Sequence, residues 1–148
     1  MIGRGQRPRF EPGEPTGGAV TIRSKRAFQR YVRRPAPLIV RFWAPRSPGR
    51  EMGPIFDHVA RQFAGKIHFL KVNTEQIPEL SLAFGVRSLP TLLVIHGKEV
   101  TNSRLGATSE ETLVEMARRA LARHRESLPL RVGRWVRVRR PTTDPGFS

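Results

Sequence analysis

The chain contains no cysteine among its 148 residues. Without a thiol it can form no disulfide, no dithiol couple, no iron–sulfur cluster and no zinc site built on cysteine. A chain of this length can bury a sizeable core without disulfides or a structural metal. The absence of cysteine therefore limits the chemistry of the protein and not its stability.

Histidine is scarce as well, and the four residues are His58, His68, His96 and His124. None of them has a second histidine or a carboxylate at the i, i+4 spacing of a familiar metal motif. We therefore expect ordinary surface or sheet-edge histidines, no metal site and no cofactor.

Long apolar runs are also missing. No window approaches the roughly 20 apolar residues of a membrane-spanning helix, since Arg41 and His96 interrupt the two longest apolar stretches. The first nine residues lack the apolar stretch of a secretory signal, and Glu11 and Glu14 count against an organellar transit peptide. We expect a cytoplasmic protein without a membrane span.

Acidic residues are few compared with basic ones: 12 Asp and Glu stand against 27 Lys and Arg, a net charge of +15. Such an excess predicts attraction to nucleic acid, an anionic membrane surface or an acidic protein. Most of the basic residues are arginines, whose guanidinium group suits phosphate. A codon-biased genome would give the same preference, so composition leaves the partner open.

The hydrophobic pattern predicts alternating strands and helices from residue 20 onward. Residues 1–19 are rich in glycine, proline and charge, and we expect a flexible arm there. A capping box with Thr108 or Ser109 and Glu111 predicts the start of the last helix. The expected strands are 20–22, 38–43, 67–72, 91–95 and 99–105, and the expected helices begin near residues 25, 52, 78 and 109. This order predicts an α/β fold with a central mixed β-sheet flanked by helices on both faces.

Several motifs follow one another in this region. They are Phe42-Trp43-Ala44-Pro45 with Pro54-Ile55-Phe56, then Lys71-Val72-Asn73, then the run from Phe84 to Thr91, and finally Gly106-Ala107. In this order and spacing they resemble the thioredoxin family, in particular its bacterial members. The resemblance implies a thioredoxin-like domain over residues 20–122. It also implies a cis-proline at Pro90 and a peptide groove closed by Gly106 and Ala107.

The resemblance fails in the loop that carries the family's two catalytic cysteines. That loop is degenerate here and consists of Arg46, Ser47, Pro48, Gly49 and Arg50, with Ser47 and Gly49 at the cysteine positions. A serine hydroxyl cannot replace the thiolate that attacks a disulfide, and glycine offers no resolving atom. The sequence therefore predicts no catalytic residue and no disulfide oxidoreductase activity. An enzyme acting through Ser47 has little support, because only Glu51 lies near it as an acid or base.

The family's buried aspartate aligns with Arg41, and Lys71 matches the lysine beside that aspartate. One hypothesis is that Arg41, Lys71, Arg46 and Arg50 form an anion pocket. The alternative, which the sequence favours, is that the arginine stems cover apolar surface with their charged heads in water.

A peptide-binding face remains when the dithiol is removed. The resemblance implies that the backbone of Leu89 pairs with an extended peptide, beside Trp43, Pro90, Gly106 and Ala107. Our first hypothesis is thus a non-catalytic, redox-inactive module that binds or scaffolds a protein partner through this face. The alternative is that Pro90 is kept only because such a strand entry is hard to rebuild.

Residues 123–148 form a basic C-terminal extension that the family's pattern does not contain. Residues 130–139 alternate and predict a further strand. Its polyanion-binding candidates are Arg131, Arg134, Trp135, Arg137, Arg139 and Arg140, which suggest stacking on bases and contact with phosphates. The second functional hypothesis is therefore a nucleic-acid or ribonucleoprotein accessory. The alternative for this segment is an edge strand whose arginines discourage aggregation.

Overall fold

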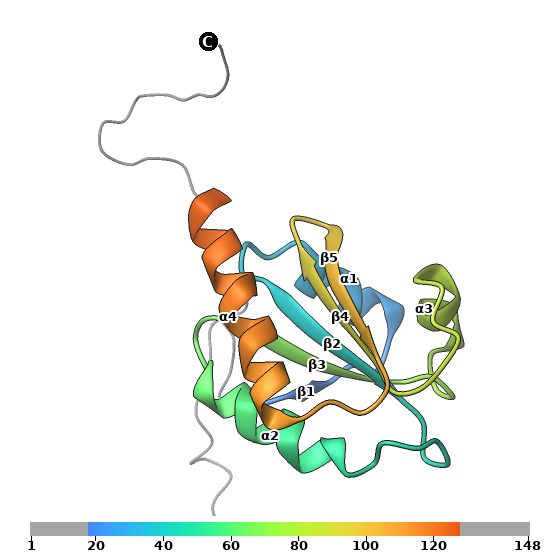
Figure 1. Cartoon of the computed structure of the whole chain (residues 1–148). Helices are drawn as coiled ribbons and strands as arrows, with labels where there is room; N and C mark the ends of the chain where they lie inside the picture. Colours follow the sequence, from blue (N-terminus) through green and yellow to red (C-terminus); the bar gives the residue numbers. More distant parts are fainter. Residues whose placement is uncertain (1–17, 128–148) are drawn as a thin grey trace, which may run out of the picture.

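The computed structural model describes residues 18–127, which form a five-stranded sheet between two layers of helices (Figure 1). The strands are β1 (Val20–Thr21), β2 (Leu38–Trp43), β3 (His68–Asn73), β4 (Thr91–His96) and β5 (Glu99–Leu105). The helices are α1 (Lys25–Val32), α2 (Met52–Gln62), α3 (Pro78–Ala83) and α4 (Glu110–Ser127). The predicted α/β fold, with a mixed sheet and helices on both faces, is confirmed. α4 continues past residue 122, where we expected the domain to end.

The strands lie in the order β1-β3-β2-β4-β5. β3 pairs in parallel with β1 and β2, whereas β4 is antiparallel to both β2 and β5. Helical crossovers join the parallel strands, and the turn Gly97-Lys98, with φ of 62° and 71°, joins β4 to β5 as a tight hairpin. This topology places β2 at the centre of the sheet, with its carboxyl end leading into α2.

Two apolar clusters fill the space on either side of the sheet, because side chains alternate along each strand. On β2, Ile39 belongs to the cluster beneath α2 and α4, whereas Val40 and Phe42 belong to the cluster beneath α1 and α3. Figure 1 shows α2 and α4 together on one face of the sheet. The same alternation directs Arg41 toward α2.

The helix starts follow local hydrogen bonding. Ser24 caps α1, since its hydroxyl accepts the Ala27 N–H at 3.1 Å. At α4 the hydroxyl of Ser109 accepts the N–H of Thr112 at 3.2 Å. A capping box needs Glu or Gln as the third residue after the cap. With Ser109 as the cap this residue is Thr112, so the predicted capping box with Glu111 is wrong. Of the helices in residues 18–127, none is long and apolar enough to cross a membrane.

Candidate functional site

The loop between β2 and α2 folds back on itself through Ser47. The Ser47 hydroxyl donates to the Ala44 carbonyl at 2.9 Å, and the Ser47 Oγ accepts the Ala44 N–H at 3.3 Å. The Ser47 N–H also donates to the Ala44 carbonyl, at 3.1 Å. Within residues 18–127 no histidine or carboxylate is hydrogen-bonded to this hydroxyl, which an activated nucleophile would need. The hydroxyl of Ser47 therefore serves to close a turn.

Gly49 brings this loop directly onto Pro90. Its φ is +88°, and a Cβ at this position would stand 2.6 Å from Pro90 Cγ. That distance is far inside van der Waals contact, and the backbone conformation is one that L side chains rarely adopt. The position that the resemblance assigns to the second cysteine therefore has no room for a side chain. The shortened loop is closed over the proline.

The segment before β4 leaves backbone groups unpaired beside this loop. The Leu89–Pro90 peptide bond is cis, as the resemblance implies. The Ser88 carbonyl accepts the Thr91 hydroxyl at 2.6 Å, and the Pro90 carbonyl accepts the Gly106 N–H at 2.8 Å. The N–H and carbonyl of Leu89, by contrast, have no hydrogen-bond partner in the described part of the chain. Such groups can pair with an extended chain laid alongside.

The residues around Leu89 form an accessible apolar margin. Trp43, Leu89 and Gly106 are half-buried, and Ala107 is exposed. Leu105, at the end of the edge strand β5, is 69% exposed, and the sequence analysis did not single it out. No sequence pattern marks Leu105, because its exposure depends on whether another element covers the face of β5 on which its side chain lies.

Arg41 is buried beneath α2. The residue is 5% exposed, and its guanidinium carbon lies 5.6 Å from the centre of the Trp43 ring. Its Nη1 and Nη2 atoms lie 3.8 and 3.9 Å from the place where a Cβ on Gly53 would stand. The expectation that the charged heads lie in water is therefore wrong for Arg41. It fails because the central strand β2 directs this side chain under the first turn of α2.

The carboxylate of Asp57 lies near two cations, Arg41 and Lys71. Lys71 is paired with Arg41 in the register of β2 and β3, and its Nζ lies 3.5 Å from Asp57 Oδ1. Burial lowers the pKa of Arg41, and the charge of Asp57 acts in the opposite direction. The sequence analysis missed Asp57, which sits on α2 one turn beyond Gly53. The other two members of the suggested pocket, Arg46 and Arg50, are exposed.

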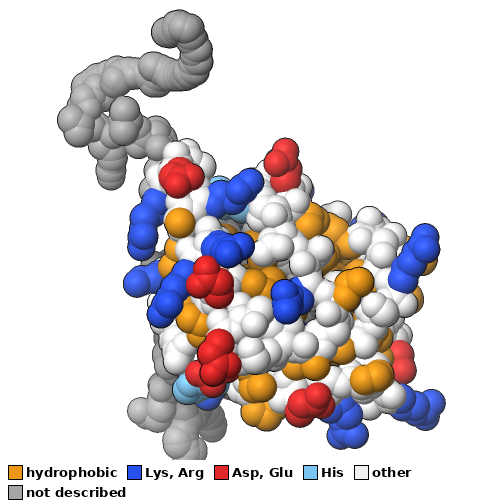
Figure 2. All heavy atoms as spheres, in the orientation of Figure 1, with side chains coloured by type: hydrophobic (Ala, Val, Ile, Leu, Met, Phe, Trp, Pro, Cys, Tyr) orange, Lys and Arg blue, Asp and Glu red, His pale blue; other side chains and the backbone are white. Residues whose placement is uncertain are grey.

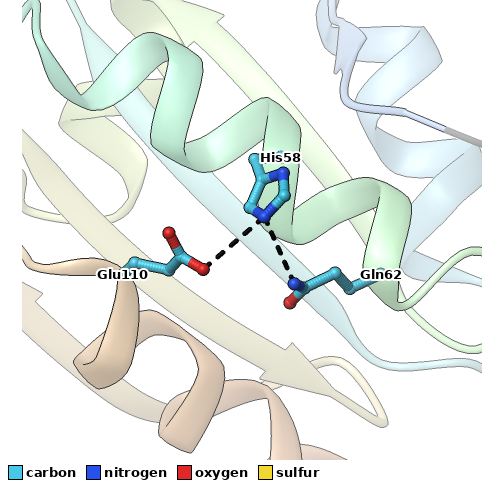
Figure 3. A network of polar contacts seen from close by, with 3 residues as sticks. All are labelled: His58, Gln62 and Glu110. Atoms are coloured by element: carbon cyan, nitrogen blue, oxygen red, sulfur yellow. Dashed lines mark hydrogen bonds and ion pairs between the residues drawn. The ribbon is translucent and has the colours of Figure 1, made fainter.

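The histidines take three different environments. His58 on α2 lies 3.3 Å from Gln62 and 3.5 Å from Glu110, at the start of α4, and so links the two helices (Figure 3). His68 is 3% exposed and packs edge-on against Tyr31, so the expectation of a surface or sheet-edge position is wrong for this residue. His96 Nε2 lies 2.9 Å from His124 Nδ1, a pairing the sequence did not reveal.

The basic candidates Arg131, Arg134, Trp135, Arg137, Arg139 and Arg140 lie outside the described residues, as does the strand predicted over 130–139. Their role as a polyanion-binding segment stays a prediction. The flexible arm expected over residues 1–19 also stays a prediction, because residues 1–17 lie outside the described part.

Comparison with known families and proteins gives one consistent result. The family model described as Thioredoxin matches residues 19–119. Thioredoxin 1 of Nostoc sp. is 40% identical over 78 residues, which cover 52% of this chain and 73% of that protein. Thioredoxin M4, chloroplastic, of Arabidopsis thaliana is 37% identical over 124 residues, which cover 81% of this chain and 64% of that protein. For the chloroplastic M-type thioredoxin of Zea mays, 41% identical, the match spans 48% of its length.

Solved structures of the same kind share the fold. A mutant thioredoxin from Halobacterium salinarum superposes with a TM-score of 0.65 at 18% identity, over 77% of this chain and 96% of that one. A Malassezia sympodialis thioredoxin gives a TM-score of 0.61 at 23% identity, over 74% and 93% of the two chains.

Proposed function

Because this chain belongs to the thioredoxin family and yet has no cysteine, we propose that it is a redox-inactive module that binds an extended segment of a partner protein. Thiol–disulfide exchange begins with attack by a thiolate, and the chain has no residue that can supply one. This chain would therefore bind a partner segment without exchanging a disulfide with it.

A single observation carries this proposal: the unpaired N–H and carbonyl of Leu89 at the entry to β4. These groups stand beside half-buried Trp43 and exposed Leu105 and Ala107. An extended peptide here would add main-chain hydrogen bonds to Leu89 and bury apolar side chains against the margin. The loop that Gly49 brings against Pro90 offers no reactive atom to a bound peptide.

Two further parts of the proposal depend on the sequence alone. We place the protein with the bacterial kind of the family, an inference supported by its 40% identity to the Nostoc protein. We also propose that the protein is located in the cytoplasm.

The proposal can be tested by selecting peptides from a displayed random library on the immobilised chain. We expect enriched extended peptides whose affinity falls at least about tenfold, or 1.4 kcal/mol, in the Ala107→Trp variant. The exposed Ala107 can carry a large side chain without disturbing the core, and this side chain would cover the groove. Ala122→Trp, at another exposed position on α4, is the matched control and should bind as the wild type does.

Two results would contradict the proposal. One is a library that yields no enriched peptide on the wild-type chain. The other is a set of peptides that bind Ala107→Trp and Ala122→Trp equally, because binding would then occur elsewhere on the surface.

A second candidate function, a nucleic-acid accessory, is favoured by the net charge of +15. On the face seen in Figure 2, several basic side chains lie over the second half of α4, acidic side chains lie over its start and its end, and other basic side chains are scattered over the rest of this face. That distribution supports a diffuse attraction to polyanions. We therefore rank this function below the peptide-binding one.

A further inference from the structure

Three polar atoms beneath the first turns of α2 are buried without a hydrogen bond. They are Arg41 Nε, Trp43 Nε1 and Asp57 Oδ1, and within residues 18–127 none has a hydrogen-bond partner. A buried donor without a partner destabilises the folded chain, and more so when the group is charged. Arg41 Nε and Trp43 Nε1 are N–H donors on neighbouring side chains of one strand face, and both lack an acceptor. The third atom, Asp57 Oδ1, is an acceptor that lies 3.5 Å from Lys71 Nζ.

The charges around these atoms do not balance. Arg41 and Lys71 face one carboxylate, Asp57, which lies 3.5 Å from Lys71. The positive end of the α2 dipole adds further positive charge to this cluster. Burial lowers the pKa of Arg41 even with Asp57 nearby, as expected where the cation is under-compensated. One further negative charge would balance this cluster.

The geometry of the cluster favours a small anion. Arg41 and Lys71 lie near the carboxyl ends of the parallel strands β2 and β3, where α2 begins. The dipole of α2 favours an anion at its start. The first N–H groups of the helix are already used, because Met52 and Gly53 donate to the Gly49 and Arg50 carbonyls, so the ion would depend on the guanidinium of Arg41. At the second residue of α2, Gly53 has no side chain to cover the Arg41 guanidinium. Because Arg41 is 5% exposed, only a compact ligand can reach it beneath α2.

We propose that the guanidinium of Arg41, buried beneath the first turn of α2, is the centre of a binding site for a small inorganic oxyanion, phosphate or sulfate. The planar guanidinium would donate two parallel hydrogen bonds to the ion, and Lys71 would contribute its charge while remaining near Asp57. This site shares Trp43 with the peptide groove. The ion would bind Arg41 beneath α2, whereas the peptide would pair with the backbone of Leu89.

The experiment uses the full chain with Trp135→Phe, which leaves Trp43 as the only one of the two tryptophans. Sodium phosphate is titrated against sodium chloride at constant ionic strength while Trp43 fluorescence is recorded. Because the Trp43 ring lies 5.6 Å from the Arg41 guanidinium, binding should change its emission in a saturable way. Sulfate should give a similar curve, and chloride alone should give none.

Two substitutions assign the response to Arg41. Arg41→Met should abolish saturation, whereas Arg61→Met, which removes an exposed arginine from the other end of α2, should preserve it. Should Arg41→Met fail to fold, Arg41→Asp gives the same test, because its carboxylate can pair with Lys71. Near-ultraviolet circular dichroism verifies the fold of each variant.

A second measurement follows the side-chain Nε–H of Arg41 and the amide of Gly53 by nitrogen-15 NMR. Both signals should shift with phosphate and follow the same saturation curve as the fluorescence. The absence of saturation in the Trp135→Phe chain would overturn the proposal. An equal response of the Arg41→Met and Arg61→Met chains would also overturn it, since the ions would then bind the basic surface in general.

Discussion

At the scale of single residues, the contact between Gly49 and Pro90 decides how the loop is closed. In Gly49→Ala the new Cβ would stand 2.6 Å from Pro90 Cγ. The alanine would also have to adopt the backbone φ of +88° that Gly49 has. We expect a loss of roughly 2 to 5 kcal/mol in the free energy of unfolding, because unfavourable backbone and overpacking add. Urea denaturation measures this loss directly.

Gly65→Ala is the matched control for this substitution. Gly65 has a φ of +82°, but a Cβ there would meet nothing within 4 Å. Gly65→Ala should lower the free energy of unfolding only through the unfavourable backbone conformation, by about 1 to 2 kcal/mol. Equal losses in the two variants would mean that the loop moves away from Pro90 at little cost.

At the scale of elements, His96 and His124 join the end of β4 to the last turns of α4. Their nitrogens lie 2.9 Å apart, and the rings meet edge-on with centroids 5.0 Å apart. Burial lowers the pKa of His96, and the nearby charges of His124 and Arg123 lower it further. Protonation of His96 is therefore resisted in the folded chain.

This lowered pKa predicts that the protein loses stability in mild acid. Below the usual histidine pKa of about 6.5, the unfolded chain takes up a proton that folded His96 does not. The free energy of unfolding should thus fall as pH decreases from 6.5 to the lower folded pKa, and remain unaffected by this residue above 6.5. Denaturation of His96→Gln from about pH 8 to about pH 5 should show a smaller fall than the wild type.

Thr101→Val controls for a change of packing at the same place. It lies on β5, and its hydroxyl makes a 3.4 Å contact with the Val94 carbonyl without titrating. Its effect on stability should be the same at every pH in this range. Were His96→Gln to show the full pH dependence of the wild type, other groups would be responsible for it.

At the scale of the whole molecule, the charge of +15 governs association with polyanions. Binding of a single-stranded oligonucleotide should weaken steeply with salt. If the C-terminal segment makes the contacts, Arg137→Ala with Arg139→Ala should reduce the slope of log K against log salt by about 1.4, or 0.7 for each lost phosphate contact. Fluorescence anisotropy at several salt concentrations measures the slope.

The double variant Arg26→Ala with Arg30→Ala removes two exposed arginines from α1 and serves as its control. A smaller effect in this control would assign the contacts to the C-terminal segment. Equal effects would contradict that assignment and indicate attraction to the molecule as a whole.

The sequence by itself determined the order of the elements and the chemistry that is excluded. The strands and helices follow from side-chain periods of 2 and 3.6 residues, which depend only on near neighbours along the chain. The Ser24 cap and the Gly97-Lys98 turn depend on equally local interactions. The absence of thiol chemistry needs no structure at all, since no cysteine is present.

Only the tertiary structure decided which distant residues meet. It placed Arg41 under α2, Gly49 against Pro90, and His96 beside His124, which is 28 positions further along the chain. It also left the backbone of Leu89 unpaired. These contacts depend on strand register and on how each helix docks, and both are set by packing over the whole core. A charged side chain such as Arg41 can therefore be buried or exposed with the same local sequence around it.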